Sequence, residues 1–194
     1  SAAITATGAY VPETILTNAM LENMVETNDE WITTRTGIKE RRILKTKGEG
    51  TSFLAIKAAN DLIQKTNLDP NTIDLVIVAT ATPDMKAAST ASYTATKIGA
   101  NNAFSFDMDS ACSGFLFGMS TAASFIESGR YKKVLLIGAD KMSSIVNYDD
   151  RATCIIFGDG AGATLFEPNE EGLGMRDEYL RTDGNGREFL QATY

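Results

Sequence analysis

The sequence predicts an α/β fold built on a central mixed, mostly parallel β-sheet. Two runs, at residues 75–79 and 133–138, are apolar at nearly every position, which is typical of strands covered on both faces inside a parallel sheet. Segments of helical periodicity or helical length lie between such runs. This alternation, βαβαβ with one further strand, indicates a sheet layered with helices.

Three short elements are expected before residue 40. Residues 3–10 form a strand, and residues 17–25 form a helix that Thr17 opens. A second short helix begins at Asn28, has an acidic first turn, where the helix dipole favours negative charge, and ends at Gly37.

The central part of the chain predicts two more helices and two strands. A long helix covers residues 51–65, with Thr51 as its cap. Its apolar stripe, at the 3.6-residue period, consists of Leu54, Ala55, Ala58 and Leu62. After the strand at 75–79 we expect a helix at 91–98 and a strand at 103–108.

The segment from residue 112 to residue 128 is apolar nearly all round, a pattern that predicts a buried helix. Residues 152–166 predict two strand halves around a GDGAGA segment at 158–163. That segment lacks the ending of a phosphate-binding loop and precedes a strand, where a dinucleotide site needs a helix. We therefore interpret it as a bend where backbone passes close to backbone or ligand.

The composition is that of an ordinary soluble domain, with 43% hydrophobic and 22% charged residues among 194. The net charge of −7 argues against nucleic-acid binding, which needs a basic face. No stretch reaches the roughly 18 apolar residues of a membrane span, no signal peptide is visible, and we expect no metal site. Two cysteines provide no disulfide framework, which favours a reducing cytoplasm.

Cys112 directly follows a predicted strand and begins the predicted buried helix. A helix N-terminus stabilises a thiolate through its dipole and its free N–H groups, and the same groups can hold an oxyanion. Cys112 is thus a candidate nucleophile, with a buried core cysteine as the alternative interpretation. Cys154, expected within a strand, is better explained by core packing.

The chain contains no histidine. A cysteine nucleophile that performs acyl chemistry nearly always uses an imidazole as base, acid or oxyanion donor. The chain therefore contains half of an active site, and we expect a second fragment or chain to complete it.

A basic segment with an aromatic residue stands out in this acidic chain: Trp31, Arg35, Lys39, Arg41 and Arg42. Tryptophan and arginine can sandwich an adenine ring, and arginine binds phosphate with a planar fork. The alternative is a solvated helix face with one anchoring tryptophan.

Three motifs, in order, resemble those of the 3-oxoacyl-[acyl-carrier-protein] synthase III family. Residues 28–38 read NDEWITTRTGI and resemble its DEW-I-x-x-RTGI block. Residues 111–115 (ACSGF) resemble its nucleophile block, and Asp150-Arg151 with residues 156–163 (IFGDGAGA) resemble its DR…FGDGAGA block.

The resemblance implies a thiolase-like fold with two similar halves, of which this chain is the N-terminal one. Residues 1–170 would form that condensing-enzyme domain, and residues 171–194 would begin the connection to a C-terminal domain. The implied enzyme initiates fatty-acid synthesis in the cytoplasm, with no permanent cofactor and with a coenzyme A thioester as substrate. It condenses an acyl primer with malonyl-acyl-carrier protein, and it is expected to be a homodimer.

The resemblance also implies roles for single residues. Cys112 would carry the acyl group as a thioester, and Thr27, Trp31, Arg35 and Arg151 would lie against the adenine side of coenzyme A. A His and an Asn that assist decarboxylation come from the family's second half, which a C-terminal fragment or chain would supply.

Ala87 departs from the family, which commonly has Phe at this position, closing the acyl pocket of the partner. The departure implies that a primer longer than acetyl is tolerated. Two alternatives stay open: another ketosynthase or acyltransferase that uses coenzyme A thioesters, and a non-catalytic partner subunit.

Overall fold

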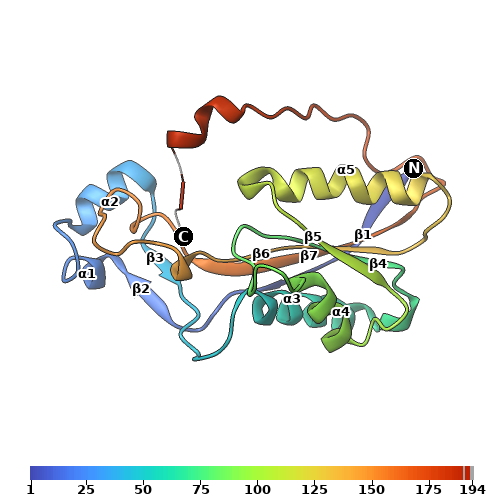
Figure 1. The fold of residues 1–194 in the computed structure, drawn as a ribbon, viewed down its shortest axis with the longest axis horizontal. Helices are drawn as coiled ribbons and strands as arrows, with labels where there is room; N and C mark the ends of the chain where they lie inside the picture. The colour runs from blue at the N-terminus through green and yellow to red at the C-terminus, as the bar shows by residue number, and fades with distance from the viewer. Residues whose placement is uncertain (190, 193–194) are drawn as a thin grey trace.

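A five-stranded sheet forms the centre of the protein, in a computed structural model that describes residues 1–189 and 191–192 (Figure 1). Its strand order is β1-β7-β6-β4-β5. The strands are β1 (Ala2–Tyr10), β4 (Leu75–Ala79), β5 (Phe104–Met108), β6 (Val134–Lys141) and β7 (Asp159–Pro168). Strand β4 is parallel to β5 and β6, whereas β7 is antiparallel to β6 and β1. Four of the five strands therefore point the same way, which confirms the mixed, mostly parallel sheet.

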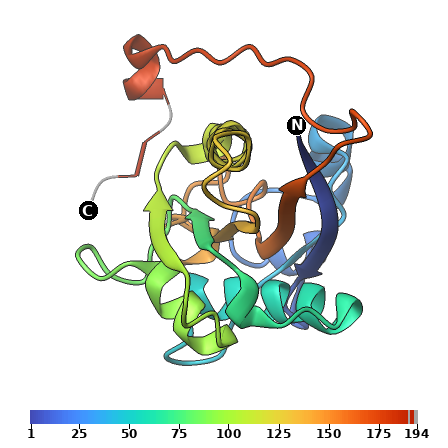
Figure 2. The ribbon, with the colours of Figure 1, turned by 90° about the vertical axis from the view of Figure 1, so that its right-hand side faces the viewer.

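Helices cover both faces of this sheet (Figures 1 and 2). Helices α3 (Thr51–Thr66) and α4 (Thr90–Ile98) lie on one face, and α5 (Gly114–Glu127) lies on the other. All five residues of β4 are buried, because the strand is central and covered on both sides, as its apolar run predicts. The predicted stripe of α3 is also fully buried against the sheet.

A small unit stands at one end of the sheet (Figure 1). It comprises the hairpin partners β2 (Ile15–Thr17) and β3 (Glu40–Arg42) with the helices α1 (Asn18–Leu21) and α2 (Asp29–Thr36). Its own apolar cluster joins it to a loop far along the chain. The cluster consists of Leu16, Leu21, Ile32, Ile43, Cys154 and Ile155.

Short 3-10 helices complete the structure, at Pro70–Thr72, Ala111–Ser113, Met142–Ser144 and Gly184–Phe189. Helix α2 begins and ends as predicted, with Asn28 as N-cap and Gly37 as left-handed C-cap. Helix α1 ends at Leu21, so the prediction of a helix to residue 25 was too long. Thr51 does not cap α3: Gly50 is the N-cap, because the Thr51 hydroxyl donates to the buried carbonyl of Thr82.

The predicted buried helix at 112–128 is partly wrong. Helix α5 starts at Gly114, and only one of its sides packs on the sheet, through Gly118, Ala122, Ala123 and Ile126. A Cβ on Gly118 would lie 2.5 Å from Leu136 Cδ1, so the helix approaches the sheet closely there. Phe115, Met119 and Phe125 are only partly buried against the same cluster, and Leu116 is 57% exposed. Apolar composition alone did not distinguish a helix packed on one side from one packed all round.

The first predicted strand half at 152–157 is also wrong, because these residues form turns and β7 starts at Asp159. The close backbone approach is confirmed at Gly158, where a Cβ would lie 3.2 Å from both Arg41 Cβ and the Arg42 carbonyl oxygen. Gly160 and Gly162 then sit inside a regular strand that pairs with β6 and, at Gly162, with β1.

Among the residues that the structure describes, no helix is both long and apolar enough to cross a membrane. In the same residues, no group of three or more His, Cys, Asp or Glu is arranged to hold a metal ion.

Candidate active site

Cys112 lies in the 3-10 turn that joins β5 to α5, and its side chain is exposed. The turn is tight: Ala111 has a φ of 44°, a left-handed conformation that costs energy for a residue with a Cβ. The start of α5 lies close to the sheet at Gly114, where a Cβ would lie in van der Waals contact with Ala79 Cβ, at 3.4 Å. This strand–turn–helix unit therefore presents the thiol at the surface. Cys112 precedes the α-helix instead of beginning it, so the predicted placement is off by two residues.

The motifs converge on one edge of the sheet. Strands β4, β5 and β6 are parallel, so their carboxyl ends lie together, and Lys141 at the end of β6 pairs with Asp159 at the start of β7. The turn of Cys112 and the loop from 142 to 158 thus leave the sheet at the same edge. Ligands of open α/β sheets bind at such carboxyl ends.

Three aspartates hold the loops at this edge, and sequence analysis did not identify them. Asp107 accepts hydrogen bonds from the N–H groups of Thr90 (2.7 Å) and Ala91 (2.6 Å) at the start of α4. Asp140 accepts from the Ala81 N–H at 2.8 Å. Asp159 accepts from the N–H groups of Leu44 and Ser143 at 2.7 and 2.8 Å. Their common signal is an acidic residue within or at the end of a strand.

Helix α2 presents Trp31 beside two arginines. The Arg35 Cζ lies 4.3 Å and the Arg151 Cζ 4.7 Å from the centroid of the Trp31 ring, both within cation–π distance. Arg151 Nη1 donates to the Glu26 carbonyl oxygen at 2.8 Å. Thr27 lies beside this contact, and its hydroxyl is buried with no hydrogen-bond partner among the described residues. The structure thus brings together Trp31, Arg35 and Arg151 from two distant segments.

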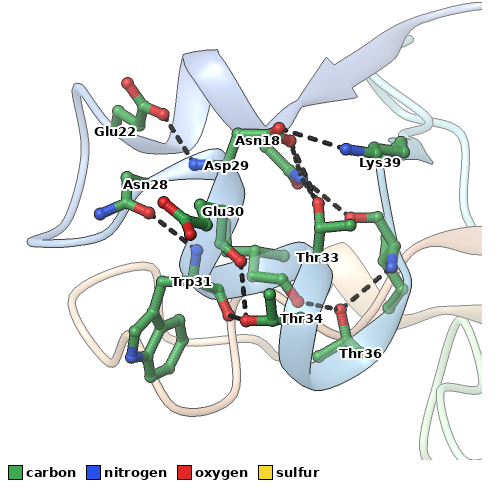
Figure 3. A network of polar contacts seen from close by, with 12 residues as sticks. Asn18, Glu22, Asn28, Asp29, Glu30, Trp31, Thr33, Thr34, Thr36 and Lys39 are labelled. Carbon is green, nitrogen blue, oxygen red and sulfur yellow. Dashed lines mark hydrogen bonds and ion pairs between the residues drawn. The ribbon is translucent and has the colours of Figure 1, made fainter.

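Hydrogen bonds hold α2 in place, and the Trp31 indole takes no part in the network drawn in Figure 3. The Asn28 side chain accepts from the Trp31 N–H at 2.7 Å. The hydrogen bond from Asn18, followed by that from Lys39, holds the pKa of Asp29 below its ordinary value. In Figure 3 the indole points away from this network, and its ring contacts the Arg35 and Arg151 guanidinium groups instead.

Two surface cavities lie near the loop from 83 to 89, with volumes of about 560 and 370 Å³. The smaller one is lined by Ala87, Met85 and Asp109, among others. Cys112 lines neither cavity. Its side chain is exposed on the described surface.

The layered sheet, the exposed cysteine at a strand's carboxyl end and the tryptophan–arginine cluster define a thiolase-like α/β fold. Comparison with known proteins agrees. The family model described as 3-oxoacyl-[acyl-carrier-protein (ACP)] synthase III matches residues 106–184. A beta-ketoacyl-[acyl-carrier-protein] synthase III of Bacteroides thetaiotaomicron is 60% identical over 190 residues, which are 98% of this chain and 57% of the relative.

Solved structures give the same result. The synthase III of Thermus thermophilus superposes with a TM-score of 0.89 at 43% identity, over 96% of this chain and 57% of that one. That of Aquifex aeolicus gives 0.83 at 47% identity, over 88% and 55%. Over nearly its whole length this chain is similar to members of the 3-oxoacyl-[acyl-carrier-protein] synthase III family, and it spans a little over half the length of these relatives.

Proposed function

We propose that this chain provides the acyl-accepting part of the condensing acyltransferase that initiates fatty-acid synthesis. One observation carries the proposal: an exposed Cys112 stands at the carboxyl edge of the sheet, the edge from which the Arg151 loop also leaves. The names of the relatives, all synthases that act on acyl-carrier protein, support the reaction class.

The proposed first stage is a thioester exchange. The Cys112 thiolate attacks the carbonyl carbon of an acyl-coenzyme A, the carbon–sulfur bond to coenzyme A breaks, and coenzyme A leaves as a thiolate that takes up a proton. The product is an acyl group on Cys112 Sγ. No oxidant, metal ion or permanent cofactor takes part in this step.

The proposed second stage joins this acyl group to malonyl-acyl-carrier protein. Loss of carbon dioxide from the malonyl group leaves an enolate. Its carbon attacks the carbonyl carbon of the Cys112 thioester, the carbon–sulfur bond breaks, and the 3-oxoacyl product forms with release of the Cys112 thiolate. The family's His and Asn would assist decarboxylation. These 194 residues contain no His, so we propose that the pair comes from sequence beyond them.

We propose that Thr27, Trp31, Arg35 and Arg151 bind the nucleotide end of coenzyme A. The indole offers a stacking surface for adenine, and the guanidinium groups attract its phosphates. With Arg151 only 4.7 Å from the Trp31 centroid, no base fits between the two side chains. Arg151 must therefore swing aside if adenine is to stack between them, which breaks its hydrogen bond to Glu26.

Further parts of the proposal follow from family resemblance. The working protein would be a cytoplasmic homodimer, with residues 1–170 as the N-terminal condensing domain and residues 171–194 leading to a second domain. The family's Phe at the position of Ala87 closes the acyl pocket of the partner, and the smaller alanine would leave that pocket larger, so a primer longer than acetyl would be accepted.

The test uses the whole protein that contains this chain, incubated with acetyl-, isobutyryl- or octanoyl-coenzyme A and analysed by intact mass. We expect one acyl group per chain on wild type and on Cys154→Ala, and none on Cys112→Ala. Acylation that survives Cys112→Ala would contradict the proposal. Acylation without a 3-oxoacyl product from malonyl-acyl-carrier protein would instead indicate an acyltransferase that uses another acceptor, and strict acetyl preference would exclude the role proposed for Ala87.

A further inference from the structure

Two buried polar side chains lie between the segments that carry Trp31 and Arg151. Asn18 is 2% exposed and Arg41 is 4% exposed. Arg41 Nη1 donates to Asn18 Oδ1. The guanidinium groups on the Trp31 ring are those of Arg35 and Arg151, and both Asn18 and Arg41 are far from the turn of Cys112 in the sequence.

Asn18 holds both ends of α2. Its Nδ2 donates to Asp29 Oδ1 at 2.7 Å, at the first residue of the helix, and to the Ile38 carbonyl oxygen at 2.9 Å, just past the helix C-cap. Figure 3 shows these contacts converging on Asn18. One amide group therefore contacts both ends of the helix that presents Trp31.

Arg41 connects that amide to the loop of Arg151. Its Nε donates to the Ile155 carbonyl oxygen at 2.8 Å, and its Nη2 donates to the same oxygen. Ile155 follows a tight turn in which the Cys154 N–H donates to the Asp150 carbonyl oxygen at 3.0 Å. Arg151 lies inside this turn, so displacement of Ile155 would move the base of Arg151.

A purely structural role explains this arrangement poorly. Burial lowers the pKa of Arg41, and the largest cause is desolvation of its charge. Replacing a buried charged network with apolar residues of similar volume is often neutral or stabilising. The Arg41 guanidinium instead donates to two separate segments, at Asn18 and at Ile155, and so fixes their relative position. A lysine ammonium lacks this planar set of donors.

We propose that Asn18 and Arg41 are positioning residues that link α2 to the Arg151 loop and thereby set the Trp31–Arg151 geometry for the nucleotide of coenzyme A. This inference rests on the proposed nucleotide site. Loosening the link lets the two segments move separately, so binding of the nucleotide weakens. The reaction at Cys112 is affected little, because its turn is held by β5 and α5.

The test compares two substrates in the whole protein, acetyl-coenzyme A and acetyl-pantetheine, which lacks the nucleotide. Arg41→Lys and Asn18→Leu should raise KM for acetyl-coenzyme A by about tenfold, the size of a typical positional coupling. They should leave kcat, and KM for acetyl-pantetheine, within about twofold. Arg130→Lys is the matched control, since Arg130 is an exposed arginine outside α2, β3 and the Arg151 loop.

The outcomes separate this proposal from the one on which it rests. If Trp31→Ala raises KM for acetyl-coenzyme A but Arg41→Lys and Asn18→Leu do not, the positioning role is wrong and the nucleotide site stands. If Trp31→Ala has no effect, and wild type uses both substrates with equal KM, the nucleotide site itself is wrong. Arg41→Lys and Asn18→Leu variants with equally impaired KM or kcat for both substrates would show a merely structural role and would also overturn the proposal.

A measurement on the wild type covers the case in which the variants do not fold. Hydrogen exchange of the whole protein is followed with and without adenosine 3′,5′-bisphosphate, the nucleotide end of coenzyme A. We expect residues 28–38, 39–42 and 150–156 to gain protection together, over the same range of nucleotide concentration. Protection of residues 28–38 without the other two segments would overturn the link.

Discussion

The two cysteines of this chain occupy opposite environments. Cys112 is exposed in a turn after β5, whereas Cys154 is fully buried in the apolar cluster of the small unit. Both are free thiols. Burial, with a smaller contribution from Asp150, raises the pKa of Cys154, which keeps this thiol neutral and unreactive.

The backbone around each cysteine explains the difference. Ala111 adopts a left-handed φ immediately before Cys112, and this directs the chain out of the sheet before α5 begins. Cys154 lies in a turn that folds under the small unit, where Leu21 and Ile32 belong to the same cluster. The exposure of Cys112 thus goes with a strained backbone next to it, whereas the burial of Cys154 comes from the side chains that surround it.

Thiol labelling gives the largest expected contrast. In the native protein, iodoacetamide should modify Cys112 faster than Cys154 by on the order of a thousandfold or more, because Cys154 reacts only when its cluster opens. Peptide mapping by mass spectrometry over a time course measures both rates in one sample. The same protein in guanidinium chloride is the control, where the two rates should converge. Comparable native rates would contradict the assignment of the two environments.

Much of the sheet could be predicted because its strands carry their own signal. Strand β4 is apolar throughout and buried at every position, and the first four residues of β6 are apolar and buried as well. Helix α2 was predicted from its two ends, since the capping residues Asn28 and Gly37 each bond to a residue within one helical turn. Local rules therefore worked where local interactions decide the structure.

Predictions failed where distant contacts decide. Thr51 is a good capping residue by type, yet its hydroxyl donates a hydrogen bond to the carbonyl oxygen of Thr82, 31 positions away. The turns at 152–157 are as apolar as a strand but pack under Ile32 and Leu21. The link from Asn18 through Arg41 to Ile155 spans most of the chain, and no local pattern indicates it.

The second contrast is in stability. Cys154→Ser should lower the free energy of unfolding by about 2–3 kcal/mol, since a buried hydroxyl loses its hydrogen bonds to water. Cys112→Ser, at an exposed position, should change it by less than about 0.5 kcal/mol. Urea denaturation of both variants and of the volume-conserving Cys154→Val provides the comparison. A Cys112→Ser loss as large as that of Cys154→Ser would show that Cys112 is packed in the folded protein.

The third contrast tests the strain at Ala111. Ala111→Gly removes the Cβ that makes φ of 44° unfavourable, although the more flexible unfolded chain opposes the gain, so stability should change by about 0–1 kcal/mol in favour of folding. Ala111→Val should cost about 1–2 kcal/mol more than Ala111→Gly, because a β-branched residue tolerates this conformation poorly. Thermal unfolding at fixed pH measures both. Equal stability of the two variants would mean that the backbone at Ala111 is not left-handed.

The fourth contrast is the smallest and appears only at alkaline pH. The folded protein raises the pKa of Cys154, so it binds the thiol proton more tightly than the unfolded chain does. The resulting stability is complete below the ordinary thiol pKa of 9.0 and is lost as pH rises from there toward the folded pKa. Tyr148 contributes with the same sign: burial, followed by the charge of Asp159, raises its pKa above the ordinary 10.0. One proton limits the Cys154 slope to about 1.4 kcal/mol per pH unit.

Cys154→Val should therefore flatten the decline in unfolding free energy between pH 8.5 and pH 10 by up to that slope, while Cys112→Ser, which leaves Cys154 in place, keeps the wild-type decline. Guanidinium chloride titrations at half-unit steps of pH measure the slopes directly. The Tyr148 contribution remains in both variants, so a residual decline is expected near pH 10 even in Cys154→Val. A wild-type decline that Cys154→Val leaves unchanged would assign the alkaline sensitivity to Tyr148 alone, and would mean that burial of Cys154 has little effect on its ionisation.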